Sequence, residues 1–221
     1  HAFWQDGWTY GLRRRDDIVP IPDCPVHKED ANQALRLLAG ILPGPDEFPL
    51  AFFVLSGAQL VMVLKTATLP SGEIIPEGVF GLLQGVGIEG LWVHLHPSAG
   101  KRVFGKGGWH LLHGRARSRD GNGMLYGPAS FQQLIPSLYE ASMDMAASFL
   151  APDGSSAVVD LYSGTGTSTR RWVAMGAATI GVEWSGEAVE CARENVPDTL
   201  ILRGLCRDRL PQLTPWMMEQ K

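Results

Sequence analysis

Two patterns of hydrophobic positions divide this chain, and the pattern changes near its middle. In the first half, short runs that alternate apolar and polar residues, or are wholly apolar, flank glycine-containing turns. Such runs predict strands joined as hairpins, whereas apolar positions spaced three and four residues apart predict helices. The expected elements are a hairpin over residues 3–11, helices over 28–42 and 76–84, and strands over 50–55, 59–66, 91–95 and 109–113. This order predicts a small α+β domain in which helices cover one face of an antiparallel sheet.

The second half alternates continuous apolar runs with helical patterns. A buried parallel strand has such a run, closed by a carboxylate and glycines. The expected elements are helices over residues 134–150, 167–175 and 185–195, and strands over 157–161, 177–182 and 199–202. The resulting β-α-β-α-β order is half of a doubly wound sheet, so the fold class is α/β with a Rossmann-like half-domain. Charge and glycine concentrate over residues 115–123, which places the domain boundary between residues 122 and 123 and gives domains 1–122 and 123–221.

The charge balance restricts how this protein meets a nucleic acid. With 19 basic and 23 acidic residues, the net charge of −4 gives no overall attraction to a polyanion, so any such contact is local. The candidate RNA-binding side chains are Arg13, Arg14, Arg15, Lys101, Arg102, Arg115 and Arg117. The alternative is that these residues form solvated loops.

The turn after residues 157–161 carries the main chemical signal. Gly164 and Gly166 leave side chains absent where the backbone of a ligand approaches. A dinucleotide site has a third glycine where Thr169 stands, so the turn suits a ligand without phosphates. Asp160 ends the first strand, where it can accept from an ammonium group, and Glu183 ends the second, where a ribose diol would lie. The alternative is a plain structural turn.

Three motifs carry a family resemblance. They are Asp160-Leu161-Tyr162-Ser163-Gly164-Thr165-Gly166, Gly181-Val182-Glu183, and Phe131-Gln132-Gln133, with Asp23-Cys24-Pro25-Val26 upstream. Together they resemble the uracil-5 RNA methyltransferases, which make 5-methyluridine in ribosomal and transfer RNA. Between residues 26 and 126 the likeness rests on the order of elements. The chain departs from the family pattern at Ser163, Ile135 and Leu205, where the family has cysteine, asparagine and a polar residue.

The resemblance implies an S-adenosylmethionine-dependent enzyme that methylates C5 of a uridine in rRNA or tRNA. By motif position, Gln133, Tyr162 and Glu183 would contact the cofactor. The full set of cofactor-binding residues predicted from the turn and the motifs is Gln133, Asp160, Tyr162, Gly164, Thr165, Gly166, Thr167 and Glu183. The alternative function is a cofactor-binding or RNA-binding module without catalytic activity of its own. A nicotinamide oxidoreductase is less well supported, because the third glycine is missing.

No catalytic residue of the family is recognised in the chain. In the family a cysteine thiolate adds to C6 of the uracil and a carboxylate base removes the proton from C5, and both residues lie beyond the third strand. Cys191 lies within a predicted helix, and Cys206 follows the third strand between Arg203 and Arg207. Neither matches the nucleophile position. We therefore expect the native polypeptide to extend beyond both ends of the chain, to contain the catalytic residues in its remainder, and to be monomeric.

The cysteine content indicates the cellular setting. Cys24, Cys191 and Cys206 are too few and too far apart for a paired disulfide framework, and no apolar run reaches the length of a membrane span. The sequence therefore predicts a cytoplasmic protein without membrane contact. The resemblance implies one further possibility, that Cys24 is a ligand of an iron–sulfur cluster whose other ligands precede His1; the alternative is a simple buried cysteine.

Overall fold

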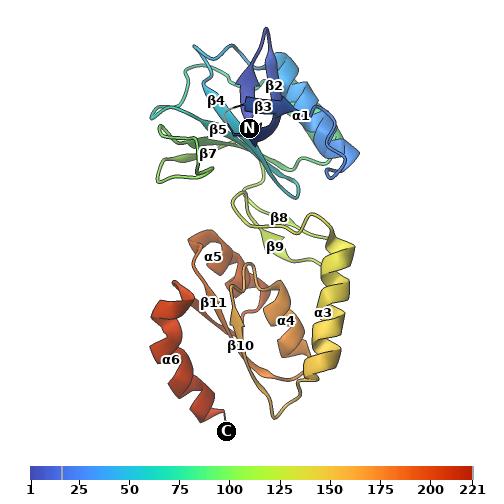
Figure 1. Ribbon diagram of the computed structural model, residues 1–221, viewed down its shortest axis with the longest axis vertical. Coiled ribbons are helices and arrows are strands. Elements are labelled where there is room, and N and C mark those ends of the chain that lie inside the picture. The colour runs from blue at the N-terminus through green and yellow to red at the C-terminus, as the bar shows by residue number, and fades with distance from the viewer. Residues whose placement is uncertain (16, 221) are drawn as a thin grey trace. The chain divides into compact units, whose positions relative to one another are not determined.

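The computed structural model describes residues 1–15 and 17–220, and the chain divides into two compact units. The first unit is His1–Ser118 and the second is Arg119–Lys221, so the division lies a few residues before the expected boundary at 122/123. Each unit has a sheet of its own (Figure 1). A search of the described helices finds none that is long and apolar enough to cross a membrane.

The main sheet of the first unit has the strand order β4-β5-β6-β7. β4 and β7 pair antiparallel with their neighbours, whereas β5 and β6 pair parallel. The prediction of an antiparallel sheet is therefore wrong at this pair, because the chain passes through a crossover helix that brings it back in the same direction. The elements are β1 Ala2–Trp4, β2 Trp8–Arg14, β3 Asp17–Pro20, α1 Glu29–Ile41, β4 Leu50–Ser56, β5 Gln59–Leu64, α2 Glu77–Gly85, β6 Gly90–Leu95 and β7 Trp109–Gly114.

Both faces of this sheet are covered. Every residue of β5 is buried, and Leu60, Met62 and Leu64 join one cluster with the apolar stripe of α1 and with α2. On the other face Val61 and Val63 pack with Phe52 and with the segment that follows β6. Since a fully buried large aliphatic side chain contributes about 1.5–3 kcal/mol, this sheet is the main source of stability in the first unit.

The second unit contains the predicted half of a doubly wound sheet. Its strand order is β10-β11-β12, and both pairs are parallel. The ends of its strands and helices lie within about two residues of the predicted ones, which is the usual spread of boundary definitions. A short ribbon of β8 and β9 comes before it in the chain. The elements are β8 Ser118–Arg119, β9 Leu125–Tyr126, α3 Pro136–Leu150, β10 Ala157–Leu161, α4 Thr167–Ala174, β11 Ala178–Glu183, α5 Gly186–Asn195, β12 Leu200–Arg203 and α6 Cys206–Glu219.

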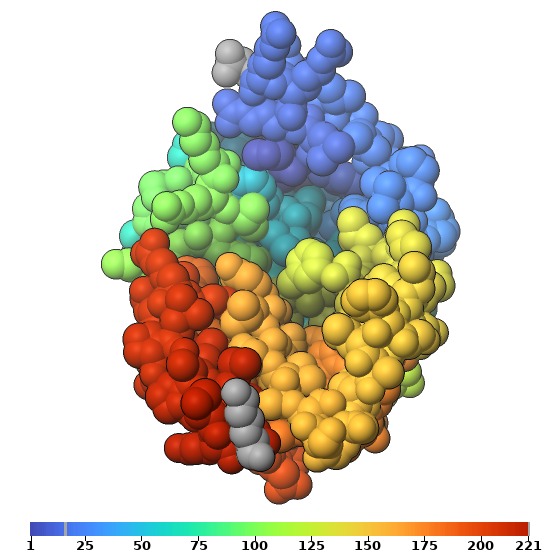
Figure 2. Space-filling model, turned by 60° about the horizontal axis from the view of Figure 1, so that its bottom comes forward, coloured from blue at the N-terminus to red at the C-terminus, as the bar shows by residue number. Residues whose placement is uncertain are grey.

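The second unit covers its elements unevenly. β11 is buried over most of its length, but both end residues of β10 are exposed, and α3 has no buried residue. Figure 2 shows α3 in yellow along the surface beside the orange segment that contains α4. The ion pair between Arg171 of α4 and Asp144 of α3 joins these two helices, at 2.5 Å. The apolar positions that predicted α3, among them Leu138, Met145 and Phe149, therefore face solvent rather than a core.

The helix α6 was not predicted. Pro211 and Pro215 lie within it, and each lacks the N–H that an α-helix uses. The helix forms nevertheless, because Leu213 is buried against Ile180 and Val182 of β11. Tertiary packing here outweighs the local preference of the sequence.

Candidate cofactor-binding site

The turn between β10 and α4 lies at the carboxyl end of the parallel sheet. Three of its residues have left-handed backbone angles, with φ of 62° at Tyr162, 55° at Gly164 and 88° at Gly166. A Cβ on Gly166 would lie 2.8 Å from Cγ2 of Val196, so this side of the turn is closed by α5. A Cβ on Gly164 would have no atom within 4 Å. The turn is therefore packed on one side and open to a ligand at Gly164.

Tyr162, next to the open part of the turn, is both strained and exposed. A left-handed conformation costs a non-glycine residue about 1–2 kcal/mol, and such strain is concentrated at binding sites. The side chain of Tyr162 is 80% exposed, so an aromatic ring stands in solvent beside the open glycine. The predicted contact of Tyr162 with the cofactor agrees with this position but is not tested by it.

Glu183 connects the ends of two strands. Its Oε2 accepts from the backbone N–H of Gly164 at 3.0 Å, and its Oε1 accepts from that of Ser185 at 2.7 Å. A carboxylate oxygen has a second lone pair, so each can accept a further hydrogen bond from a hydroxyl group. The acid is therefore held rigidly at the carboxyl edge of the sheet, next to the open part of the turn.

Asp160 anchors α4, a role that the sequence analysis did not predict. Its Oδ2 accepts from the hydroxyls of Ser168 at 2.8 Å and Thr169 at 2.6 Å. Burial raises the pKa of the Asp160 carboxyl, and the two hydroxyl hydrogen bonds oppose that rise only in part. Thr169 thus has a function that explains its place where a dinucleotide site has glycine. This contact between Thr169 and Asp160 joins residues nine positions apart, so the sequence analysis did not predict it.

Gln133 and Thr167 line two hollows beside α3. Gln133 is exposed and lines a hollow of about 470 Å³, while Thr167 lines one of about 360 Å³, and Tyr139 borders both. Within the described chain, no hydrogen bond joins Gln133 to Asp160 or Glu183. Of the predicted residues, Gly164 and Glu183 are joined by a hydrogen bond, and Asp160 lies on the strand that leads into the same turn, whereas Gln133 lines the hollow bordered by Tyr139.

Asn195 and Glu187 of α5 were missed by the sequence analysis. Asn195 Nδ2 donates to the carbonyls of Leu125 at 2.9 Å and Thr165 at 2.8 Å, and its Oδ1 accepts from the N–H of Leu125 at 2.7 Å. Glu187 accepts from the N–H of Ala129 at 3.0 Å. Thr165, predicted to contact the cofactor, is buried and gives its carbonyl to this network. Polar residues inside an amphipathic helix carry no periodic signal, so only the structure reveals them.

The predicted RNA-binding residues are all in the first unit, on three separate segments. Arg13, Arg14 and Arg15 lie at the end of the β2–β3 ribbon, Lys101 and Arg102 between β6 and β7, and Arg115 and Arg117 after β7. All are exposed except Arg117, which is half-buried. Whether the three segments form one RNA surface is not tested by these positions, so a shared RNA surface stays a prediction.

The cysteines lie in different environments. Cys191 is fully buried in α5, and Cys206 packs beside the cluster of Ile180, Val182 and Leu213. Cys24 is half-buried, and the side chain of Asn32 holds its backbone through two hydrogen bonds of 3.1 and 3.2 Å. Residues 1–15 and 17–220 contain no group of three or more His, Cys, Asp or Glu side chains that could hold a metal ion. These hydrogen bonds hold the backbone of Cys24 and leave its thiol free of a described role, so Cys24 as a ligand of an iron–sulfur cluster stays a prediction.

The charges around the turn define what it can bind. Residues 161–167 contain no lysine or arginine, and the Glu183 carboxylate already occupies the N–H of Gly164. A phosphate would therefore meet a negative charge where a nucleotide site offers positive ones. The arrangement suits a neutral nucleoside whose hydroxyl groups donate to Glu183.

Comparisons with known proteins agree with this fold. No family model matches the chain. An uncharacterized RNA methyltransferase of Thermosynechococcus vestitus is 26% identical over 193 residues, which cover 80% of this chain and 42% of that protein. The crystal structure of the Pyrococcus abyssi tRNA (uracil-54, C5)-methyltransferase in complex with S-adenosyl-L-homocysteine superposes with a TM-score of 0.64 and 20% identity, covering 92% of this chain and 53% of that one. The chain thus spans about half the length of these proteins or less, and it has the Rossmann-like methyltransferase fold preceded by a small α+β domain.

Proposed function

We propose that this chain is the cofactor-binding part of an S-adenosylmethionine-dependent RNA methyltransferase that acts on C5 of a uridine in tRNA or rRNA. The observation that carries the proposal is Glu183, an acid fixed at the end of β11 with both oxygens beside the open turn at Gly164. The similarity to a protein named as an RNA methyltransferase supports the reaction class. Because the chain spans 42% of that relative, the activity proposed is that of a protein with the remaining part as well.

The residues of the site fit this cofactor. Glu183 would accept from the ribose hydroxyls, the open face of Gly164 admits the backbone of the ligand, and Tyr162 provides an exposed aromatic surface. Asp160 would accept from the ammonium group, directly or through water, because only one of its oxygens is bound to α4 hydroxyls. When bound, S-adenosylmethionine supplies an electrophilic methyl group.

The nucleophile and the base of the proposed reaction are assigned to no residue of this chain. C5 of uracil becomes nucleophilic when a thiolate adds to C6, and a base must then remove the proton from C5. Cys191 is buried in α5, and Cys206 packs against the apolar cluster of β11 and α6. The chain's own contribution is therefore to bind and orient the cofactor and, through its first unit, the RNA.

The first experiment measures S-adenosylhomocysteine binding to the 221-residue chain by calorimetry. Glu183→Ala removes two charge-assisted hydrogen bonds to the ribose, each worth about 1.5–3 kcal/mol, so affinity should fall by roughly tenfold or more for each. Glu183→Gln keeps one acceptor, so its affinity for S-adenosylhomocysteine should lie between those of the wild type and Glu183→Ala. Asp198→Ala, which removes an exposed carboxylate of the same unit, is the matched control and should bind as the wild type does. An unchanged affinity of Glu183→Ala would contradict the site, and binding of NAD in place of S-adenosylhomocysteine would favour an oxidoreductase.

The second experiment tests the position of methylation. The polypeptide that includes the remaining part is incubated with S-adenosylmethionine and with tRNA or rRNA transcripts labelled with tritium at C5 of uridine. Replacement of the C5 hydrogen by methyl releases tritium to water, whereas methylation at a nitrogen or at the ribose releases none. Methyl incorporation without tritium release would keep the methyltransferase but reject C5.

A further inference from the structure

The segment between β6 and β7 is basic and rich in glycine. Residues 100–108, which we call the basic loop, contain Lys101, Arg102 and Lys106, four glycines and no acidic residue. The three basic side chains are exposed. Because glycine gives a chain unusual conformational freedom, contacts with the sheet decide whether this loop has a fixed shape.

The backbone of the basic loop lies against the end of β6. A Cβ on Gly105 would lie 2.7 Å from Nδ1 of His96, and one on Gly107 would lie 1.7 Å from the carbonyl oxygen of Leu95. No side chain fits at either position, so glycine allows this close contact. At this end of the strand His94 is fully buried and His96 is 7% exposed. Two histidine rings are therefore packed beneath a segment that has few side chains of its own.

A hydrogen bond joins the basic loop to His94. The backbone N–H of Gly105 donates to Nε2 of His94 at 3.1 Å. A backbone N–H can only donate, so Nε2 is the unprotonated nitrogen and the ring is neutral, with its proton on Nδ1. The centroid of this ring lies 4.3 Å from that of Trp109 and 5.5 Å from that of Phe104. Phe104 belongs to the loop, so the loop contacts His94 through both its backbone and a side chain.

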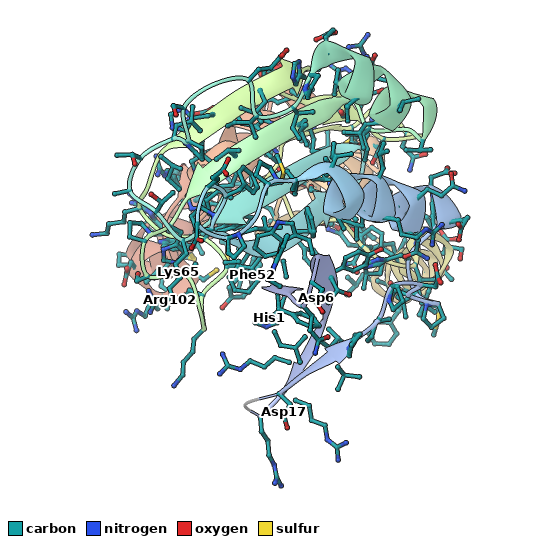
Figure 3. All side chains as sticks on the ribbon, turned by 90° about the horizontal axis from the view of Figure 1, so that it is seen from above. His1, Asp6, Asp17, Phe52, Lys65 and Arg102 are labelled. Carbon is teal, nitrogen blue, oxygen red and sulfur yellow. The ribbon has the colours of Figure 1, made fainter. Side chains whose placement is uncertain are left out.

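The elements around His94 contain no negatively charged side chain. β4, β5, β6, the basic loop and β7 lie within residues 49–65 and 90–114, which contain no aspartate or glutamate. In Figure 3, Lys65 and Arg102 are both on the side of the unit away from α1. The ionisable groups of the loop and of the neighbouring strand ends are Lys65, His96, Lys101, Arg102 and Lys106, with His1 against Phe52 of β4. A protonated His94 would therefore have no opposite charge beside it.

The two histidines of β7 face away from His94. His110 follows Trp109 along the strand and points to the other face of the sheet, and His113 pairs with Glu77 of α2, which covers that face. Burial lowers the pKa of His94; the carbonyl of Gly108 opposes this change, and nearby His96 adds to it. The fold thus favours the neutral ring that the hydrogen bond from Gly105 requires.

We propose that His94 is an acid-sensitive switch that holds the basic loop on the sheet and releases it when the ring is protonated. A proton taken from solvent by Nε2 occupies the lone pair that accepts from Gly105, so two N–H groups then face each other and the loop opens. The sheet fixes the positions of the three basic side chains at neutral pH, and the open loop does not. This inference goes beyond the proposed function and does not depend on it, because every residue in it belongs to the first unit.

The direction of the pH dependence follows from the two states of the loop. In the open loop the His94 ring contacts water and has the ordinary histidine pKa of about 6.5, whereas in the closed loop its pKa is lower. The closed loop is therefore fully stable above about pH 6.5 and loses stability as the pH falls towards the lowered value. Between the two pKa values, the ratio of open to closed loop should rise by up to about tenfold per pH unit.

The experiment is NMR-detected hydrogen exchange of the 221-residue chain over a pH series from about 7.5 to about 5. The protection factor of the Gly105 amide should fall by up to about tenfold per pH unit below about pH 6.5. Amides of β5, which is buried in the same sheet, should keep their protection factors. A constant protection factor at Gly105 over the whole series would overturn the proposal.

Variants show which histidine is responsible. The amide oxygen of glutamine can accept from Gly105 and does not titrate, so His94→Gln should keep the loop protected at every pH. His110→Gln, on the neighbouring strand but facing away, is the matched control and should keep the wild-type pH dependence. A pH dependence that persists in His94→Gln and disappears in His96→Gln would assign the switch to His96 and overturn the proposal.

The wild-type chain decides the question if His94→Gln does not fold. The NMR chemical shifts of the His94 ring and of the Gly105 amide should titrate with the same midpoint, below about pH 6.5, because one protonation event changes both. Different midpoints for the two groups, or a His94 ring that titrates while the Gly105 amide does not respond, overturn the proposal.

Discussion

An inner strand of the first unit, β5, and an edge strand of the second unit, β10, differ in how fully they are covered. All residues of β5 in the first unit are buried, between α1 and α2 on one face and the segment after β6 on the other. In the second unit β10 has exposed residues at both ends and half-buried ones between them, and α3 has no buried residue. Similar apolar strand sequences therefore have different surroundings.

The difference matches the candidate roles of the units. In the first unit apolar side chains are used mainly for packing. In the second unit the exposed ones include Leu161 and Tyr162 after Asp160, and Trp184 after Glu183, at the carboxyl edge where ligands bind in parallel sheets. Apolar side chains at this edge of the second unit are therefore exposed rather than buried in a core. Hydrogen bonds from Asn195 and Glu187 of α5, rather than a large core, hold the turn and the segment around Ala129 in place.

The largest expected effect tests the difference in cover directly. Leu60→Ala in β5 should destabilise the first unit by about 2–5 kcal/mol, because a fully buried leucine leaves a cavity. Val158→Ala in β10 should cost about 1 kcal/mol or less, since its side chain is only half-buried. Hydrogen exchange of the full chain reports each unit separately. Equal losses at the two positions would show that β10 is as well packed as β5.

The second-largest expected change in stability comes from replacing Asn195. Asn195→Ala removes three hydrogen bonds, each worth about 1 kcal/mol, so the second unit should lose about 2–3 kcal/mol. S-adenosylhomocysteine affinity should fall with it, because the carbonyl of Thr165 loses its donor. Asn122→Ala, at an exposed position of the same unit, is the control and should stay within about 0.5 kcal/mol of the wild type. Full stability and affinity in Asn195→Ala would mean that the core alone fixes the turn.

A pH series on Asp160 gives a smaller effect of known sign. The raised pKa of this carboxyl means that the folded chain binds the proton more tightly than the unfolded chain, whose pKa is about 3.9. Its stabilising contribution is therefore complete below that value and is lost as the pH rises through the folded pKa. Asp160→Asn keeps an acceptor for Ser168 and Thr169 without the buried charge. In denaturant titrations it should exceed the stability of the wild type at pH 7, and the gain should disappear on acidification; a gain independent of pH contradicts the assignment.

The smallest effect concerns α3. Arg171 pairs with Asp144 at 2.5 Å and Glu140 at 3.7 Å, both on the exposed helix. Exposed pairs contribute about 0.2–1 kcal/mol, so Arg171→Gln should leave global stability almost unchanged. Hydrogen exchange within α3 should nevertheless increase, and more at low salt than at high salt. Unchanged exchange in α3 would show that apolar contacts hold the helix.

The elements that could be predicted from the sequence are those whose type is indicated by one local pattern of apolar residues. The order β10-α4-β11-α5-β12 was predicted because apolar runs closed by glycine or a carboxylate differ clearly from helical spacing. The strand β3 was missed, since Ile18 and Val19 are too short an apolar run, and α6 was missed because Pro211 and Pro215 argue against a helix. The parallel pairing of β5 with β6 depends on the crossover through α2, which alternation alone does not reveal.

The candidate site divides in the same way. Asp160, Gly164 and Glu183 were predicted because strand ends of a parallel sheet share one edge. Asn195 and Thr169 were not, because their roles depend on the segments that folding brings to them. A hydrogen bond between residues 70 positions apart, such as that from Asn195 to Leu125, leaves no periodic trace in the sequence.

The burial of Cys191 makes its thiol a chemical probe for opening of the second unit. Cys191 is fully buried in α5, so alkylation of its thiol requires that unit to open. Cys24 of the first unit is half-buried and is the internal reference, because its thiol is partly accessible in the folded unit. Mass spectrometry of a single reaction can follow both thiols, because they fall on different peptides. Alkylation of Cys191, and not of Cys24, should slow when S-adenosylhomocysteine binds, according to the stability that the ligand adds.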